Sequence, residues 1–202
     1  MIKHVVFDLG GVIERVYPEK VIDSFKTIGV LNYKEIFSLN SQLHICDQFE
    51  TGKITFKDFF DSIKKLSTGD INIYDVKSAW CSNQGGVSKN TETYLKKLKE
   101  KCHISLLSNT NETHYKYILE SYKKKFGYEF ESLFESIILS YKAGIRKPSP
   151  QIFKRSFNAT EEHYSKILYV DDLKKNCDAA KRLGVESLHH QTNRSIDLGK
   201  FF

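Results

Sequence analysis

The sequence lacks the features of disulfide-bonded, zinc-binding and membrane-spanning proteins. Its 202 residues include four cysteines, and none of them lies in a Cys-x-x-Cys pair. A zinc site and dithiol redox chemistry therefore have no support, and reduced thiols are expected. No stretch approaches the roughly 20 apolar residues that a membrane-spanning helix needs, and the first residues lack the apolar run of a secretory signal. We expect a cytoplasmic protein without a membrane partner.

A strong charge imbalance is also missing. The formal net charge is +6, and basic residues alternate with acidic ones along predicted helices, as in residues 96–101. This pattern is typical of solvated helix faces, with at most a modest attraction for an anionic substrate. No nucleic-acid-binding motif is present, so we expect no nucleic-acid partner. The sequence does not indicate the oligomeric state.

The chain is instead rich in short apolar runs that alternate with amphipathic segments. The runs predict buried strands over residues 4–8, 103–108, 135–140, 167–171 and 185–189. Helices are predicted over residues 90–101, 111–122, 148–157 and 174–183, with a shorter helix capped by Thr160. Strands that alternate with helices form parallel β-α-β units, so we expect an α/β fold with a parallel sheet.

Residues 16–87 break this alternation, because they contain no convincing strand. Helical spacing and capping residues predict helices over residues 18–28, 33–43, 55–65 and 73–81. We therefore expect two domains: an α/β core made of residues 1–15 and 88–202, and an all-helical insertion made of residues 16–87.

Polar side chains stand at the ends of three predicted strands. Asp8 follows the first and precedes Gly10 and Gly11, Ser108 ends the second, and Asp171-Asp172 ends the fourth; Lys147 lies in a loop before a helix. The carboxyl ends of parallel strands share one edge, where ligands bind. Crowded carboxylates repel one another unless a cation neutralises them, and oxygen ligands without His or Cys suit Mg²⁺. A lysine and a hydroxyl suit an anionic group such as phosphate.

Four short motifs appear in order: Phe7-Asp8-Leu9-Gly10-Gly11-Val12, Leu106-Leu107-Ser108-Asn109, Arg146-Lys147-Pro148, and Val170-Asp171-Asp172 with Asn176 after it. With these motifs the chain resembles the haloacid dehalogenase-like (HAD) superfamily, specifically its phosphatase-type members with a small helical cap. The resemblance covers nearly the whole chain. It implies a Rossmann-like parallel sheet with helices on both faces and an inserted all-helical cap, which excludes water and selects the substrate.

The resemblance also implies a role for each matching residue. Asp8 would be the nucleophile that forms an aspartyl-phosphate, while Ser108 and Lys147 would bind and neutralise the phosphoryl group. Mg²⁺ would be bound by Asp8, the backbone carbonyl of Gly10 and Asp172. The remaining motif residues would support the site: Asp171 and Asn176 would hold metal-bound waters, and Asn109 would contact the substrate.

One position departs from the family pattern. Family phosphatases usually carry a second aspartate two residues after the nucleophile, where this chain has Gly10. That aspartate supplies general acid–base catalysis, typically worth 10²–10⁴-fold. The leading hypothesis is a Mg²⁺-dependent phosphatase for a small phosphorylated metabolite, such as a sugar phosphate. The alternative is a catalytically weak domain that binds a phosphorylated ligand or a protein partner. Carbon–halogen hydrolysis is disfavoured, since it needs no Mg²⁺ and the Asp171-Asp172 pair is intact.

Overall fold

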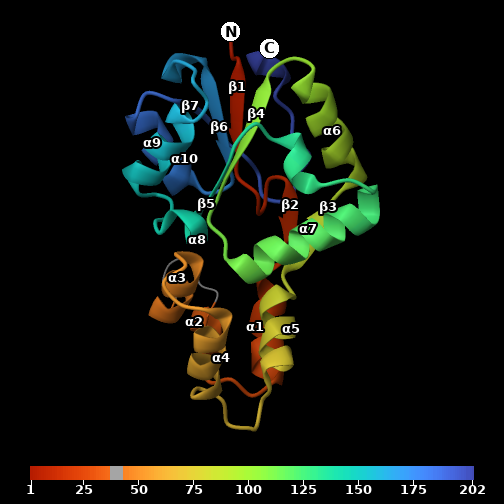
Figure 1. Cartoon of the computed structure of the whole chain (residues 1–202), viewed down its shortest axis with the longest axis vertical. Helices are drawn as coiled ribbons and strands as arrows, with labels where there is room; N and C mark the ends of the chain where they lie inside the picture. Colours follow the sequence, from red (N-terminus) through yellow and green to blue (C-terminus); the bar gives the residue numbers. More distant parts are fainter. Residues whose placement is uncertain (37–42) are drawn as a thin grey trace.

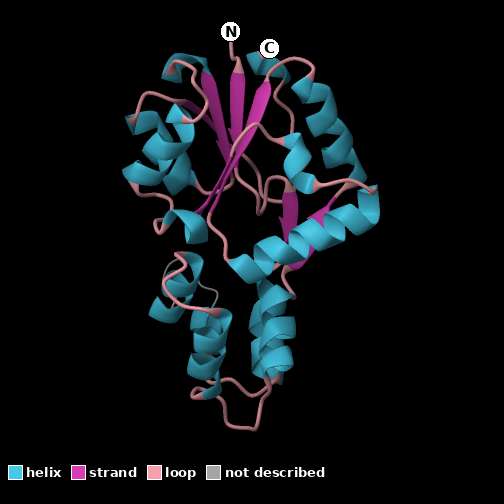
Figure 2. Cartoon of the chain, in the orientation of Figure 1, coloured by secondary structure: helices cyan, strands magenta, loops and turns pink. Residues whose placement is uncertain are grey.

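A computed structural model describes residues 1–36 and 43–202. A five-stranded parallel sheet, flanked by helices, forms its upper part in Figures 1 and 2. The strand order is β5-β4-β1-β6-β7. The strands are β1 (His4–Phe7), β4 (His103–Ser108), β5 (Ile137–Leu139), β6 (Ile167–Asp171) and β7 (Glu186–His189). The predicted α/β class and all five predicted strands are therefore confirmed.

Alternate side chains of the central strands supply two separate apolar layers. Val5 and Phe7 of β1 pack with α6 (Lys89–Lys99) and α7 (Glu112–Phe126) on one face. Val6 packs on the other face with α9 (Pro150–Asn158) and α10 (Lys174–Arg182). Figure 1 shows these two helix pairs on opposite sides of the sheet. A strand buried on both faces explains the continuous apolar run that follows His4.

Residues between β1 and α6 contain helices with a core of their own. The helices are α1 (Pro18–Thr27), α2 (Tyr33–Ile36), α3 (His44–Glu50), α4 (Phe56–Lys64) and α5 (Ile73–Cys81). Their apolar side chains gather around Trp80 and Phe59, separately from the layers on the sheet. Thr55 and Asp58 form the expected capping box at the start of α4. Among the described residues, none of this segment joins the five-stranded sheet.

The prediction that residues 16–87 contain no strand was wrong at the two ends of this segment. Glu14–Val16 forms β2, Gln84–Val87 forms β3, and the two pair as a separate antiparallel ribbon. A three-residue strand and a strand containing Gly85-Gly86 are too short to display an alternating pattern. Their pairing joins residues about 70 positions apart, which local periodicity does not reveal.

Two helix predictions also need correction. Thr160 does not begin a helix: its hydroxyl donates to the carbonyl of Phe157 at the end of α9, and the chain forms a 3₁₀ turn at Tyr164–Lys166 instead. The expected helix over residues 33–43 is present as α2 up to Ile36, while residues 37–42 lie outside the described residues. Helix α3 was not predicted. The remaining elements are a short helix, α8 (Ser140–Ala143), and two 3₁₀ turns, at Phe130–Leu133 and Gly199–Phe201.

None of the described helices combines the length and apolar character needed to cross a bilayer.

Candidate active site

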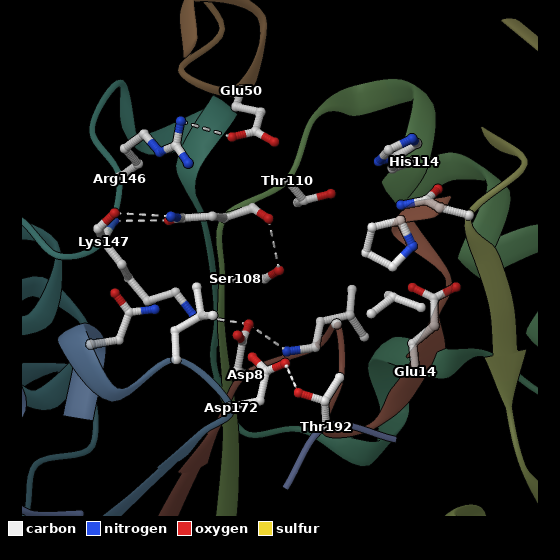
Figure 3. A pocket seen from close by; sticks show the side chains of 18 of the residues that line it. Asp8, Glu14, Glu50, Ser108, Thr110, His114, Arg146, Lys147, Asp172 and Thr192 are labelled. Atoms are coloured by element: carbon white, nitrogen blue, oxygen red, sulfur yellow. Dashed lines mark hydrogen bonds and ion pairs between the residues drawn. The ribbon is translucent and has the colours of Figure 1, made fainter. Parts of the chain in front are cut away.

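A cavity of about 240 Å³ lies where the carboxyl ends of β1, β4 and β6 face the inserted helices (Figure 3). It is lined by the predicted residues Asp8, Gly10, Ser108, Asn109, Lys147, Asp172 and Asn176. Of the predicted set, only Asp171 is absent from the lining, and it lies directly behind Lys147. The fold thus brings together side chains that are up to 168 positions apart in the sequence.

Lys147 is the centre of the charged cluster. Its ammonium lies 2.8 Å from Asp8 Oδ1 and 2.8 Å from Asp171 Oδ2, and it donates to the carbonyl of Leu107 at 3.0 Å. The side chain is only 1% exposed. Burial alone would lower the pKa of Lys147, but the two carboxylates raise it above its ordinary value. The lysine is therefore held charged beside Asp8.

Asp171 is fully buried, and both of its carboxylate oxygens are occupied. Besides Lys147, it accepts hydrogen bonds from the hydroxyl of Tyr169, the amide of Leu173 and the side-chain amide of Asn176. Although burial acts in the opposite direction, the charge of Lys147 and these hydrogen bonds lower the pKa of Asp171. Asp171 therefore acts on the site through Lys147, which it positions and keeps charged.

The carboxylates of Asp8 and Asp172 accept fewer hydrogen bonds than that of Asp171. Asp8 Oδ1 accepts from the Leu9 amide at 2.7 Å and from Lys147, and Asp172 Oδ2 accepts from the Thr192 hydroxyl at 2.9 Å. Burial raises the pKa of both aspartates, and the neighbouring carboxylates raise it further. Carboxylate oxygens of Asp8, Asp171 and Asp172 all lie within 4.8 Å of one another. Such a set of hard anionic oxygens fits a divalent cation such as Mg²⁺.

Gly11 is required for the position of Asp172. Its φ is +75°, and a Cβ atom there would lie 2.1 Å from Asp172 Oδ2. Both the left-handed backbone and the close approach demand glycine. Gly10 is different, since its backbone is unstrained and a Cβ would meet only the Val16 side chain, at 3.3 Å. The missing aspartate at position 10 is therefore not imposed by lack of space at Cβ.

The loop after β4 supplies the other predicted side chains. Ser108 is 2% exposed, and among the described residues its hydroxyl makes a single long hydrogen bond, of 3.4 Å to the Asn109 carbonyl. The hydroxyl is therefore available to a ligand. Asn109 accepts from the Lys147 amide at 2.8 Å and donates to the Lys147 carbonyl at 3.0 Å. Both polar ends of Asn109 thus hold the loop that carries Lys147.

Several lining residues were not identified from the sequence. Those from the insertion and its ribbon are Glu14, Val16, Pro18, Glu50, Asn83 and Gln84, and those from the core are Leu9, Thr110, His114, Arg146, Leu173 and Thr192. Arg146 was quoted in a motif without a role; its guanidinium pairs with Asp47 and, at 3.0 Å, with Glu50, both of α3. His114 stacks on Trp80 and shares a 2.8 Å hydrogen bond with the Trp80 carbonyl.

Comparison with known proteins adds three findings. The family described as haloacid dehalogenase-like hydrolase matches residues 2–184. A protein named D-ribitol-5-phosphate phosphatase, from Bacteroides thetaiotaomicron, is 28% identical over 187 residues, which are 93% of this chain and 91% of that protein.

Solved structures extend the likeness. A HAD-family enzyme from Bacteroides thetaiotaomicron, crystallised with magnesium and inorganic phosphate, is 31% identical, with a TM-score of 0.89 over 100% of both chains. A HAD-like hydrolase from Porphyromonas gingivalis is 25% identical, with a TM-score of 0.87 over 96% of this chain and 93% of that one.

Proposed function

The chain belongs to the haloacid dehalogenase-like hydrolase family, and from that premise we propose that it is a Mg²⁺-dependent phosphatase acting on a small sugar or polyol phosphate. The observation that carries the proposal is the convergence of Lys147, Asp8 and Asp172 at one cavity. A similar protein is named as a phosphatase of ribitol 5-phosphate, and a similar structure contains magnesium and phosphate. Those ligands are consistent with the charges of this cavity.

Asp8 is the proposed nucleophile. Its Oδ1 receives both the Leu9 amide and Lys147, which leaves Oδ2 to attack phosphorus. In that step the Oδ2–P bond forms and the ester P–O bond breaks, so that an aspartyl-phosphate and an alkoxide leaving group result. Lys147 stabilises the charge that builds on the phosphoryl oxygens, and the Ser108 hydroxyl donates to one of them. Water then hydrolyses the aspartyl-phosphate.

Asp8, Asp172 and the Gly10 carbonyl would hold the Mg²⁺, with Asn176 supporting water molecules around it. Asp171, whose oxygens are occupied, would act on the site through Lys147 and Asn176. The bound cation would neutralise phosphate charge and allow two carboxylates to remain ionised in one site. Residues 16–87 would act as the cap that selects the substrate, because several of their side chains line the cavity.

Gly10 favours a second candidate function, a domain that binds a phosphorylated ligand or protein with little turnover. No side chain at position 10 can protonate the leaving group or activate water, although Lys147 lies beside Asp8 and the carboxylates of Asp8 and Asp172 are close together. Such a protein would bind phosphate esters tightly and release phosphate slowly.

Phosphate release tests the proposal. Sugar phosphates, polyol phosphates and 4-nitrophenyl phosphate are incubated with the wild-type protein, with Mg²⁺ or with EDTA. We expect Mg²⁺-dependent release that Asp8→Asn abolishes. If wild-type protein binds these esters in Mg²⁺ without releasing phosphate from any of them, the binding function replaces the phosphatase.

A further inference from the structure

The wall of the cavity opposite Lys147 is unusually rich in hydrogen-bond acceptors. Figure 3 shows Glu14 and His114 on the side away from Arg146 and Lys147. Glu14, Asn83 and Gln84 line the cavity, and Glu14 and Asn83 are 3% and 4% exposed. Within residues 1–36 and 43–202, no hydrogen-bond donor reaches Glu14 Oε1, Asn83 Oδ1 or Gln84 Oε1.

Three unpartnered oxygens at one cavity are costly for a folded protein. A buried polar atom without a partner costs about 1–3 kcal/mol, and a buried ionised carboxylate costs more. An apolar side chain at position 14 would remove that cost. Buried polar atoms that lack a hydrogen-bond partner and face a cavity are typical of binding sites, where a ligand supplies the missing hydrogen bonds.

The backbone fixes the positions of these three side chains. Glu14 begins β2, and Gln84 begins β3, which pairs with it. The Asn83 carbonyl accepts from the Tyr17 amide at 2.9 Å, and Gln84 Nε2 donates to the His114 carbonyl at 3.1 Å. The Glu14 amide donates to the Leu9 carbonyl at 2.8 Å. The acceptors therefore stand on a ribbon that is tied directly to the loop after Asp8, as a preformed site requires.

We propose that Glu14, Asn83 and Gln84 form a subsite that binds hydroxyl groups at the end of the substrate away from its phosphate. This inference rests on the proposed phosphatase function and gives its substrate class: phosphate monoesters that carry several hydroxyls and no carboxylate. Hydroxyls donate to all three oxygens, whereas a carboxylate at that end would place anionic acceptors against acceptors. The subsite thus determines specificity, while Asp8 and Lys147 perform the reaction.

The environment of Glu14 agrees with neutral hydroxyl ligands. Burial raises the pKa of Glu14 to about 8, although the nearby Gly86 amide and Gln84 side chain act in the opposite direction. A carboxyl group in such surroundings is matched more easily by a neutral hydroxyl than by a second anion.

A substrate series with matched variants tests the subsite. For each protein, kcat/KM is measured in Mg²⁺ with D-ribitol 5-phosphate, propyl phosphate, 3-phosphoglycerate, phosphoethanolamine and 4-nitrophenyl phosphate. Glu14→Leu and Gln84→Leu should lower the ratio of kcat/KM for ribitol 5-phosphate to that for 4-nitrophenyl phosphate at least 10-fold. Glu14→Gln, which retains one acceptor, should lower it less. Arg15→Gln, the exposed neighbour on β2, should keep the wild-type ratio.

Each other result counts against the subsite. An unchanged ratio in Glu14→Leu or Gln84→Leu would overturn it, as would a wild-type preference for propyl phosphate or 3-phosphoglycerate. Preference for phosphoethanolamine would show that the wall binds an ammonium instead. If thermal melts show that the leucine variants do not fold, the isosteric Glu14→Gln variant is used instead. A lowered ratio in Glu14→Gln then supports the subsite, and an unchanged ratio overturns it. Failure of the proposed function is distinguishable, because the wild type would then release phosphate from none of the five esters.

Discussion

At the scale of single residues, Lys147 is buried, and a buried ammonium is tolerated only beside groups of opposite charge. Its ammonium is compensated by Asp8 and Asp171, each at 2.8 Å. Removing one member of a buried ion pair leaves the other charges uncompensated, which is more destabilising than replacing the whole group.

Lys147→Met should therefore destabilise the protein by about 3–5 kcal/mol, besides abolishing phosphate release. Urea unfolding followed by circular dichroism measures the difference. Lys97→Met, a change of an exposed lysine on α6, serves as control and should stay within about 0.5 kcal/mol of wild type. Equal stability of the two variants would mean that Lys147 is not held in the charged cluster.

Gly10 offers a second change at this scale. A Cβ at position 10 meets only Val16 Cγ1, at 3.3 Å, so a small shift of one side chain admits aspartate. The wild type should give a burst of nitrophenol from 4-nitrophenyl phosphate followed by slow turnover, because that leaving group needs little protonation. Gly10→Asp should raise the steady rate by roughly 10²-fold, as an added general acid–base would.

Rapid-quench and steady-state assays separate the two phases. Gly10→Ala, which adds the Cβ without the carboxyl, is the matched control and should stay at the wild-type rate. A steady rate that is equal in the aspartate and alanine variants would show that another group already activates water.

Asp8, Ser108 and Asp172 were predictable from the sequence because each stands at the end of a strand whose carboxyl end must reach one edge of the sheet. Lys147 lies in a loop after α8 and was identified through its motif. Asp8, Ser108 and Asp172 lie at that edge, and the cavity contains them. Glu14 and Gln84 were not predictable, since each lies on a short strand whose partner is distant in the sequence. The carboxamide of Asn109 was assigned to substrate, yet it binds the Lys147 backbone, a contact that requires the loop geometry.

At the scale of elements, ion pairs, a hydrogen bond and a close backbone approach attach α3 to the α/β core. Arg146 pairs with Asp47 and Glu50, and the Ser140 hydroxyl donates to the Glu50 carbonyl at 2.6 Å. Gly52, just after α3, lies so close to Tyr141 that a Cβ would be 2.2 Å from its carbonyl oxygen. Since Arg146 immediately precedes Lys147, the attachment of α3 and the position of Lys147 depend on one loop.

Arg146→Gln should loosen α3 more than the rest of the fold. We expect amide hydrogen exchange in α3 to accelerate roughly 10-fold, which corresponds to about 1.4 kcal/mol, while β4 is unaffected. Lys57→Gln breaks the exposed Lys57–Asp61 pair of α4 and should change exchange little. Uniform acceleration across α3 and β4 would contradict a local attachment.

Elements of regular length were predictable, because capping residues and periodicity are local signals. The capping boxes of α4 and α5 and the two-sided strands β4 and β6 are examples. Helix α3 has no side-chain cap and is only seven residues long. Its buried Cys46 and Phe49 pack into the core of the insertion, and its contacts with residues 140 and 146 attach it to the α/β core. These are tertiary contacts, which a local sequence pattern does not reveal.

At the scale of the whole molecule, binding of Mg²⁺ should be linked to folding. A ligand that binds only the folded state adds about 2.7 kcal/mol of stability at 100 times its Kd. Mg²⁺ should therefore raise the Tm of the wild type but not that of Asp172→Ala. Without Mg²⁺ the variant should be at least as stable as wild type, because burial and Asp171 both raise the pKa of Asp172.

Differential scanning fluorimetry with and without a saturating concentration of Mg²⁺ measures both effects. Asp178→Ala on α10, which loses only a surface pair with Lys174, should keep the response to Mg²⁺. Retention of the full response by Asp172→Ala would exclude Asp172 as a ligand.

Acid stability is the second property of the whole molecule, and it depends on histidines that are buried without charge. Burial and the neighbouring His103 lower the pKa of His4 to about 4, although Glu135 and Glu162 act in the opposite direction. Burial likewise lowers the pKa of His114 to about 4. In the unfolded chain both rings take up a proton near pH 6.5.

The folded state therefore binds fewer protons than the unfolded state between these values. A base whose folded pKa is lowered contributes stability that is present above pH 6.5 and is lost as the pH falls towards 4. His4→Gln retains a hydrogen-bonding group next to Ser105, which lies 2.8 Å from the ring, and has no proton to gain. Its unfolding free energy should fall less steeply than that of wild type between pH 6.5 and 4.5, and the slope that His114 contributes should remain. Urea unfolding at both pH values measures the difference, with His44→Gln as the exposed control. Parallel pH profiles for wild type and His4→Gln would show that His4 is protonated equally in the folded and unfolded states.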